Sequence, residues 1–455
     1  MNPEVTAAII AASVSVLTLI GTLAAQYVGR RATSKQLDRT LGQQRTRALN
    51  ERFATSAEQL GSDKPAVQLA GVYAMAALAD EWEENRQTCV DVLCAYLRMP
   101  YEPDPGRGAP EPQRLAFQAI REVRHTVIRV ITAHLREGAA IAWRGVNFDF
   151  TGVVFDGGDF YGAQFSGGRV SFTRARFSSG EIHFGAQFSG AYVSFGDTEF
   201  SGSEVYFRGA QFSGGEVYFT GATFSGGRVF FSHAQFSGGE VYFARTRFCG
   251  GEVHFTDASF SGGMVDFGGV GFSRGDVVFS RARFSGGRVF FRHTWFSGGT
   301  IHFAGAVFSG GTLYFRDTEF SGATVNFTGA EFSGGRVYFA RTRFSGGELD
   351  FSGAEFSGGK VDFSDAEFSG GEVDFIDAGD WSFPPAFPWT DTPPSGVKLP
   401  TKKEPSRTLA DDLRLDTPGR AGNARRRGRG YPAGGRASLA VEVGRTRWTH
   451  PRLRC

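Results

Sequence analysis

The residues of this chain that most often carry chemistry are its four cysteines, and their spacing is not that of a reactive site. They are Cys89, Cys94, Cys249 and Cys455. The spacing matches neither a zinc-binding pattern nor a redox CxxC motif, and it outlines no disulfide framework, which favours a reducing compartment. The stretch ENRQT at residues 84–88 holds no paired acid and base. The sequence therefore predicts no catalytic residue, no metal ligand and no bound cofactor.

The elements that would have to position any site come from an internal repeat. Gly accounts for 63 and Phe for 46 of the 455 residues, and so high a Phe content indicates a regular core. Aligned on one Phe, successive units read FSGGEVYFTGAT, FSGGRVFFSHAQ and FSGGEVYFARTR. The anchor phenylalanines recur every 12 residues from Phe188 to Phe368. Repeats of this kind indicate a solenoid in which each unit stacks on its neighbours.

Each unit carries its apolar residues at fixed steps. In one unit Val217, Phe219, Ala222 and Phe224 are separated by steps of two, three and two. A step of two keeps both side chains on one face of a strand, so each such pair predicts a short strand with both apolar residues inside. The Thr220–Gly221 link predicts a tight corner. Each Ser-Gly-Gly link predicts a wider corner, because Gly tolerates positive φ.

This unit resembles that of the pentapeptide-repeat family, in which a small residue stands two positions before a central Leu or Phe. VYFTG at residues 217–221 and ATFSG at residues 222–226 both match, and the resemblance covers residues 146–378. It implies a mainly β fold, a right-handed quadrilateral β-helix with four pentapeptides per coil. This chain inserts two residues after every second pentapeptide, so four sides give a coil of two complete units. A coil of a single unit would crowd two Phe into one small turn. The longer coil predicts a rod about 45 Å long.

Residues 5–28 form an unbroken uncharged stretch, long enough to cross a bilayer as a helix. A buried soluble helix and a secretory signal peptide are the alternatives. Six basic residues follow this stretch, at positions 30, 31, 35, 39, 45 and 47. By the positive-inside rule they lie in the cytoplasm. The sequence thus predicts a single-pass anchor in the cell membrane, with the N-terminus outside and the solenoid cytoplasmic.

Residues 32–137 contain no repeats and are expected to form a small α-helical connector. The clearest pattern is the apolar face from Ile120 to Leu135, with steps of three and four residues. The polar face of the same segment carries Arg121, Arg124, Arg129 and Arg136. Two interpretations of these arginines stay open, a solvated face and a contact with anionic lipid or a partner.

A coil of two units predicts columns of outward side chains along the rod. One column is aromatic for most of its length. It runs Tyr218, Tyr242, Asp266, Phe290, Tyr314, Tyr338 and Asp362. The five aromatic members are a candidate interaction face, and the alternative is that their rings only stack on each other. A neighbouring column runs Glu216, Glu240, Met264, Arg288, Thr312, Arg336 and Lys360. Its mixed signs are typical of a solubilising ladder.

The last coils are acidic. From Glu348 to Asp380 there are ten acidic residues against Lys360 alone. The candidate acidic end comprises Asp350, Asp362, Asp365, Glu367, Glu372, Asp374 and Asp377. Some members of the resembled family mimic duplex DNA and bind type II topoisomerases, and the resemblance extends that possibility to this chain. The predicted membrane anchor and the basic middle of the rod argue against it.

The two ends of the solenoid need covers, because exposed ends of stacked repeats are unstable. Residues 139–146 are expected to seal the first coil. Residues 379–389 are expected to form a hydrophobic cap through Trp381, Phe383, Phe387 and Trp389. Residues 390–455 are rich in Pro, Gly and Arg and are expected to be a disordered basic tail.

The sequence therefore predicts a non-enzymatic, membrane-anchored repeat protein that presents a rigid solenoid surface to a protein partner. The alternative is an acidic-ended DNA mimic that binds or inhibits a type II topoisomerase. Apart from that alternative, neither nucleic acid nor a small-molecule substrate is expected as a partner, since the net charge is only +2.

Overall fold

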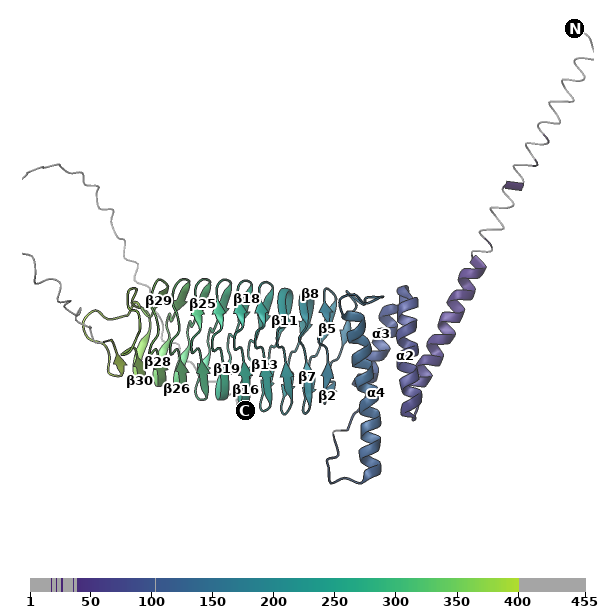
Figure 1. Cartoon of the computed structure of the whole chain (residues 1–455), viewed down its shortest axis with the longest axis horizontal. Coiled ribbons are helices and arrows are strands. Elements are labelled where there is room, and N and C mark those ends of the chain that lie inside the picture. The colour runs from purple at the N-terminus through teal and green to yellow at the C-terminus, as the bar shows by residue number, and fades with distance from the viewer. Residues whose placement is uncertain are drawn as a thin grey trace, which may run out of the picture.

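The computed structural model describes residues 39–102 and 104–400, together with residues 18, 22, 26, 27 and 36. A group of helices comes first and a long β-solenoid follows, with α4 lying across the first coils (Figure 1). The described solenoid has about ten turns. The mainly β architecture behind a small helical region is as the sequence predicts. The hand of the coil stays a prediction.

The helical region is a compact cap with its own core. It comprises helical residues 39–60, α2 (Pro65–Glu81), the short η1 (Glu83–Asn85), α3 (Arg86–Arg98) and α4 (Glu111–Leu135). Helix α2 begins with Pro65, whose fixed φ and missing N–H suit a first turn. Met75, Leu93 and Val127 come from three different helices and are fully buried. Packing between the helices, rather than helix propensity alone, therefore holds this region together.

The predicted membrane anchor, residues 5–28, lies outside the described residues except for positions 18, 22, 26 and 27. In the part of the chain that the structure describes, no helix has both the length and the apolar character needed to cross a bilayer.

The solenoid is built from two parallel sheets that face each other across the core (Figure 1). The 15-stranded sheet comprises β1 (Phe148–Asp149), β4 (Gln164–Phe165), β5 (Arg169–Ser171), β8 (Gln187–Ser194), β11 (Gln211–Tyr218), β14 (Gln235–Phe236), β15 (Glu240–Tyr242), β17 (Ser259–Phe260), β18 (Met264–Asp266), β20 (Arg283–Phe284), β21 (Arg288–Phe290), β24 (Val307–Phe308), β25 (Thr312–Tyr314), β27 (Arg336–Tyr338) and β29 (Lys360–Asp362).

The second sheet has 16 strands and supplies the opposite wall of each coil. It comprises β2 (Val154–Phe155), β3 (Gly158–Asp159), β6 (Arg176–Phe177), β7 (Glu181–His183), β9 (Glu199–Phe200), β10 (Glu204–Tyr206), β12 (Thr223–Phe224), β13 (Arg228–Phe230), β16 (Arg247–His254), β19 (Gly271–Val278), β22 (Trp295–Phe296), β23 (Thr300–His302), β26 (Glu319–Asn326), β28 (Arg343–Asp350), β30 (Glu367–Asp374) and β31 (Val397–Lys398).

The register of the strands gives the length of a coil. Phe212 pairs with Phe236, and Phe236 pairs with Phe260, so equivalent positions in successive coils are two units apart. This is the coil length that the sequence predicts. The first coils are shorter by one or two positions, because Phe155 pairs with Phe177 and Phe165 pairs with Phe188.

The two kinds of link differ in what they join. Between the sheets the chain reverses in a β-turn, in which Ala222 N–H donates to Phe219 O at 2.9 Å and Gly221 has φ +75°. The Ser-Gly-Gly links stay within one sheet, and β11 runs through Gly214 and Gly215 with only a shift of register. The Ser-Gly-Gly link therefore turns the chain within one hydrogen-bonded sheet, whereas the tight link joins the two sheets.

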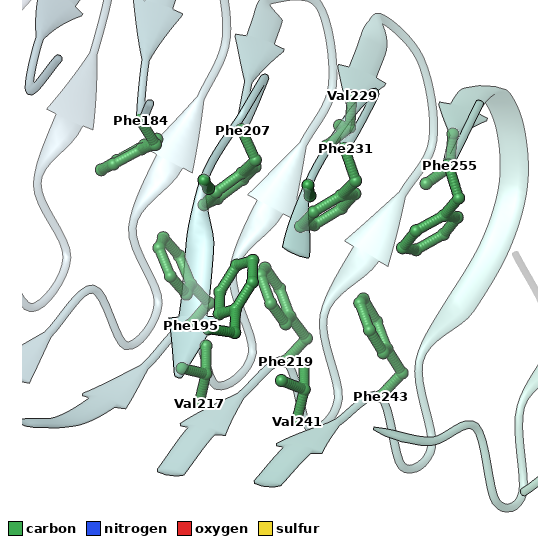
Figure 2. Packing of buried hydrophobic residues seen from close by; sticks show 14 of the residues in the cluster. Phe184, Phe195, Phe207, Val217, Phe219, Val229, Phe231, Val241, Phe243 and Phe255 are labelled. Carbon is green, nitrogen blue, oxygen red and sulfur yellow. The ribbon is translucent and has the colours of Figure 1, made fainter. Parts of the chain in front are cut away.

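The core is a set of stacked phenylalanine columns. Phe207, Phe231 and Phe255 form one column, with ring centroids 4.6 and 4.8 Å apart (Figure 2). Phe219 and Phe243 belong to the facing column, and the two columns meet edge to face at 5.8 and 6.0 Å. Offset stacking within a column and edge-to-face packing between columns are both favourable ring geometries. The core is therefore continuous along the rod.

Buried threonines bind one edge of the core to the coil before it. Most units have Ala at the position after the turn, but some have Thr, and these are Thr198, Thr246, Thr294, Thr318 and Thr342. Each hydroxyl donates to a backbone carbonyl 26 or 27 residues earlier; Thr246 to Phe219 O, at 2.9 Å, is one example. The five positions are separated by whole coils, so all five lie in one column.

The C-terminal end is covered mainly as expected. Trp381 contacts the last core rings edge-on, with centroids 5.2 Å from Phe356. Phe387 stacks on Phe363 at 5.7 Å and on Trp389 at 4.7 Å. Phe383 is 56% exposed, so its side chain does not seal the end.

The start of the predicted basic tail is ordered. Residues 390–400 are described, and β31 pairs with β30 through Val373 and Val397. Disorder from residue 390 is therefore wrong for this part, because Val397 adds one more rung to the ladder. Residues 401–455 lie outside the described part of the chain.

Replacing Gly239 by Ala is expected to destabilise the rod by more than the about 1 to 3 kcal/mol of a left-handed backbone alone. Its φ is +69°, and an added Cβ would lie 2.6 Å from Gly215 O of the coil before. Gly329 is the matched control, since its φ is +61° and nothing lies within 4 Å of an added Cβ. Urea unfolding of both Ala variants measures the difference. Equal midpoints would contradict the steric argument.

Candidate interaction surfaces

The aromatic column lies on the outside of the 15-stranded sheet in the predicted order. Tyr218 pairs with Tyr242, and Phe290, Tyr314 and Tyr338 pair in sequence. Ring centroids are 4.8 Å apart for Tyr218 and Tyr242, and 4.9 and 5.5 Å apart along the second run. All five rings are half-buried, so each still presents surface to solvent.

Asp266 divides the column into two runs. It takes the place of a ring between Tyr242 and Phe290. Its carboxylate accepts a hydrogen bond from the Gly268 N–H at 2.8 Å and forms an ion pair with Arg292 at 2.7 Å. The guanidinium of Arg292 also lies 4.6 Å from the centre of the Phe290 ring. The interruption is therefore a structured break, and the two runs have separate surroundings.

The first run is acidic. The hydroxyl of Tyr218 donates to Glu216 at 2.9 Å, and that of Tyr242 donates to Glu240. Burial and the hydrogen bond to Glu216 raise the pKa of Tyr218 to about 12. The same two causes, with Glu240 as the acceptor, raise the pKa of Tyr242. These phenols therefore stay neutral at physiological pH and cannot act as bases.

The second run is basic. Arg288 and Arg336 stand in the column beside these rings, in β21 and β27, and both are exposed. Neither forms an ion pair with any described residue. Lys360 lies 5.5 Å from the centre of the Tyr338 ring but is paired with Asp362 at 2.8 Å. One continuous face thus changes charge along its length.

A second aromatic column lies on the 16-stranded sheet, and the sequence interpretation missed it. His183, Tyr206, Phe230 and His254 stack in successive coils at 4.9 to 5.0 Å. Reading the same repeat position in the alternate units would have found it. The column supplies a control for any role of the first one, because it has the same kind of rings on the opposite sheet.

The structure does not bring the candidate acidic end together on one surface. Asp350, Glu367, Glu372 and Asp374 belong to the 16-stranded sheet, whereas Asp362 belongs to the 15-stranded sheet. Asp365 and Asp377 lie in turns that join the two sheets. A single acidic strip is therefore not formed.

Several of these carboxylates are already engaged. Glu367 pairs with Arg343 at 2.9 Å, and Lys398 pairs with both Glu372 and Asp374. Burial opposes ionisation of Asp350, yet hydrogen bonds from Ser352 and Thr328 lower its pKa below the usual value. These groups stabilise turns and neighbouring coils, which leaves less free charge for a partner than the composition suggests.

The arginines of α4 mostly contact the solenoid, which neither sequence interpretation foresaw. Arg124 is 4% exposed and donates to Leu97 O and Val154 O, both at 2.8 Å. Arg136 donates to Tyr161 O at 3.1 Å. Arg129 is the exception, since it pairs with Glu122 on its own helix. Arg124 thus belongs to an internal interface between cap and rod, while the side chains of Arg121, Arg129 and Arg136 stay 42%, 52% and 50% exposed, and a contact of these with lipid or a partner stays a prediction.

Asp156 is the centre of this interface. It is 7% exposed and accepts hydrogen bonds from Tyr101 at 2.6 Å, Arg121 at 3.0 Å and His125 at 3.1 Å. Burial alone would raise the pKa of Asp156. The bonds from His125 and Tyr101, with the charges of His125 and Arg121, lower it below its ordinary value. A buried carboxylate in the first coil therefore fastens the helical cap.

Residues 139–146, expected to seal the first coil, include Trp143, which packs against the helical region. Trp143 is fully buried, donates from Nε1 to Asp80 at 2.8 Å and stacks on His134 at 4.0 Å.

The two cysteines of the helical region are buried. Burial raises the pKa of Cys89 to about 11 and that of Cys94 to about 12, which disfavours the nucleophilic thiolate form. Within residues 39–102 and 104–400 no three His, Cys, Asp or Glu side chains gather as metal ligands would. A cavity of about 680 Å³ lies between α4 and the segment after α3. Tyr101 and Phe117 line it, and Arg124 in its wall is already bound to backbone carbonyls.

The parallel register, the stacked core and the Gly-containing turns define a β-solenoid repeat protein. A family model described as pentapeptide repeats (9 copies) matches residues 184–235. The match covers part of the solenoid, and parallel strand pairing continues on both sides of the matched span. No curated protein and no solved structure is significantly similar to it.

Proposed function

We propose that this chain is a non-enzymatic repeat protein whose solenoid presents a rigid face to a protein partner. The observation that carries the proposal is the aromatic column of the 15-stranded sheet. Its five rings lie in a regular register and remain half-exposed along the rod. Tyr and Phe are enriched at protein interfaces, and a preformed rigid face loses little conformational entropy on binding.

The proposal includes a membrane anchor at residues 5–28, with the solenoid on the cytoplasmic side. Its support is the long uncharged stretch and the six basic residues after it. An anchor of this kind would concentrate the rod at the membrane surface, where its partner would be recruited.

The alternative, an acidic-ended mimic of DNA that binds a type II topoisomerase, has weaker support. A mimic needs a continuous strip of free carboxylates, whereas these carboxylates are divided between two sheets and several are paired. Supercoiling assays with the full chain address this alternative directly, and inhibition at stoichiometric amounts would favour it.

Replacing Tyr242, Tyr314 and Tyr338 together by Ser is expected to abolish partner capture. The full chain, tagged and extracted from the membrane fraction of its own cells, is used to isolate bound proteins. The triple variant removes three rings from the face, and a ring at the centre of an interface contributes about 2 kcal/mol or more. The partner bands are expected to fall to background.

The matched control replaces Tyr206 and Phe230 on the 16-stranded sheet by Ser, which is expected to leave capture unchanged. Undiminished capture by the triple variant would show that the aromatic face is not the binding surface. Recovery of the full chain in the soluble fraction would count against the anchor, independently of the face.

A further inference from the structure

Charges on the face beside the aromatic column are segregated. Glu216 and Glu240 lie in adjacent coils and pair in register. Arg288 and Arg336 lie further along the same column, with Thr312 between them. None of the four charged groups forms an ion pair with a described residue. The like charges of Glu216 and Glu240, about 4.8 Å apart in adjacent coils, are unfavourable, so opposite charge from outside would relieve them.

This arrangement is complementary to itself when it is reversed. A two-fold axis, placed midway between Met264 and Arg288, keeps each column opposite itself and inverts its order. Glu216 of one copy then faces Arg336 of the other, and Glu240 faces Thr312. In the aromatic column, Tyr218 faces Tyr338, and Tyr242 faces Tyr314. No like charges in these two columns meet in this register.

Other registers fit less well. With the rods parallel and the same coils opposite each other, Glu216 would meet Glu216 and Arg336 would meet Arg336. In the antiparallel arrangement, a shift of one coil in one direction would place Arg288 opposite its own copy. A shift in the other direction would place Asp266 opposite its own copy. Of these arrangements, only the unshifted antiparallel register places no like-charged side chains of the two columns opposite each other; the last is the least disfavoured of the others, because Asp266 is 8% exposed and paired with Arg292.

The two columns form a long, narrow strip. The six coils from Glu216 to Arg336 extend about 29 Å, and the three-residue strands that carry the columns, such as β15 (Glu240–Tyr242) and β21 (Arg288–Phe290), are about 10 Å long. The strip is smaller than the about 800 Å² per partner of a standard interface, so its charged and aromatic contacts must supply the specificity of the dimer. A contact of this kind uses the same patch on both copies, as isologous two-fold interfaces do.

We infer that the partner of the 15-stranded face is a second copy of this chain, bound face to face and antiparallel. The inference rests on the proposed function, because it names the partner for the same face. The Tyr218 and Tyr242 hydroxyls each occupy one oxygen of a glutamate, which orients Glu216 and Glu240 along the face. Arg336, which would face Glu216 of the other copy, has no competing ion pair among the described residues.

The test is a charge exchange followed by mass measurement. The full chain in a non-ionic detergent is examined by size-exclusion chromatography with light scattering, and the wild type is expected to be a dimer. Glu216→Arg and Arg336→Glu, each alone, are expected to weaken the dimer about 100-fold, because symmetry repeats each like-charge contact twice. Neither change threatens folding, since both positions are on the surface and Glu216→Arg places opposite charge beside Glu240.

Mixing the two single variants is expected to restore the dimer, because each contact between positions 216 and 336 of the two chains is then Glu with Arg. Glu348→Arg, an exposed change on the 16-stranded sheet, is the control and is expected to leave the mass unchanged. A wild-type monomer, no restoration on mixing, or loss of the dimer in the Glu348→Arg control would each overturn the inference. A monomer that still captures another protein through its tyrosines would leave the proposed function standing.

Discussion

Replacing Phe255 by Ala is expected to lower the free energy of unfolding by about 3 to 5 kcal/mol. The ring is fully buried and stacks between Phe231 and Phe279, at 4.8 and 4.7 Å. Edge contacts at 6.0 Å join it to Phe243 and Phe267. Because the coils on either side are held in register, they cannot collapse into the space, and a large part of the cavity remains.

The measurement is urea unfolding followed by circular dichroism. Phe230→Ala is the matched control, since Phe230 also stacks on both neighbours, at 5.0 Å, but lies on the outside of the 16-stranded sheet. Its loss is expected to cost less than about 1 kcal/mol. Equal costs at the two positions would mean that stacking, and not burial, dominates the stability of the rod.

Replacing Asp156 by Asn is expected to cost about 3 kcal/mol near neutral pH, because one partner of a buried charged network is removed. Arg121 and His125 would lose their carboxylate, and Tyr101 would lose a charged acceptor. The helical cap should then separate from the first coil more easily. The midpoint of urea unfolding measures the loss.

This stabilisation should depend on pH in a defined direction. The folded-state pKa of Asp156 is lower than its ordinary value, so its contribution is present above the unfolded pKa and disappears as the pH falls through the folded pKa. The gap between wild type and Asp156→Asn should therefore close in strong acid. Asp159→Asn is the control, since Asp159 is half-exposed and its pair with Arg136 spans 3.7 Å. A gap that persists unchanged in strong acid would contradict this account.

The solenoid could be predicted closely because its rules are local and repeated. A step of two residues places Val217 and Phe219 on the same side of a strand, and their burial confirms it. The recurrence of the unit then implies the register, and pairing of Phe212 with Phe236 confirms a coil of two units. Every unit carries the same apolar pattern. A wrong assignment of inward and outward positions in one unit would therefore conflict with the pattern of the next.

Two features were not predicted from the sequence: the hydrogen bonds of the buried threonines and the interface between the helical cap and the rod. Thr246 stands where most units have Ala, and the spacing of such threonines by whole coils was a readable signal that the sequence interpretation did not use. Arg124 stood on a helix face that looked solvated, because periodicity along one helix says nothing about what packs against it. Its acceptor, Val154 O, is 30 residues away and belongs to another element.

The sequence predicts glycines at the Ser-Gly-Gly link from their tolerance of positive φ, but a single unit does not explain why two are needed. The reason is steric, because the backbone of the previous coil lies too close to leave room for a side chain at either glycine. An added Cβ on Gly238 would lie 2.6 Å from Ser213 O, and one on Gly239 would lie 2.6 Å from Gly215 O. Two consecutive glycines are needed because backbones meet there, a requirement that arises only between coils.

The parallel register of the rod also makes it a molecular ruler. From β8 onward each coil repeats the cross-section of the one before, and the buried rings of one coil meet those of the next in the same geometry. Gain or loss of one pair of units would therefore change the length by about 4.8 Å and leave both covers intact. The number of coils sets the distance between the helical cap and the C-terminal aromatic cover, and evolution can adjust that reach in fixed increments by duplicating pairs of units.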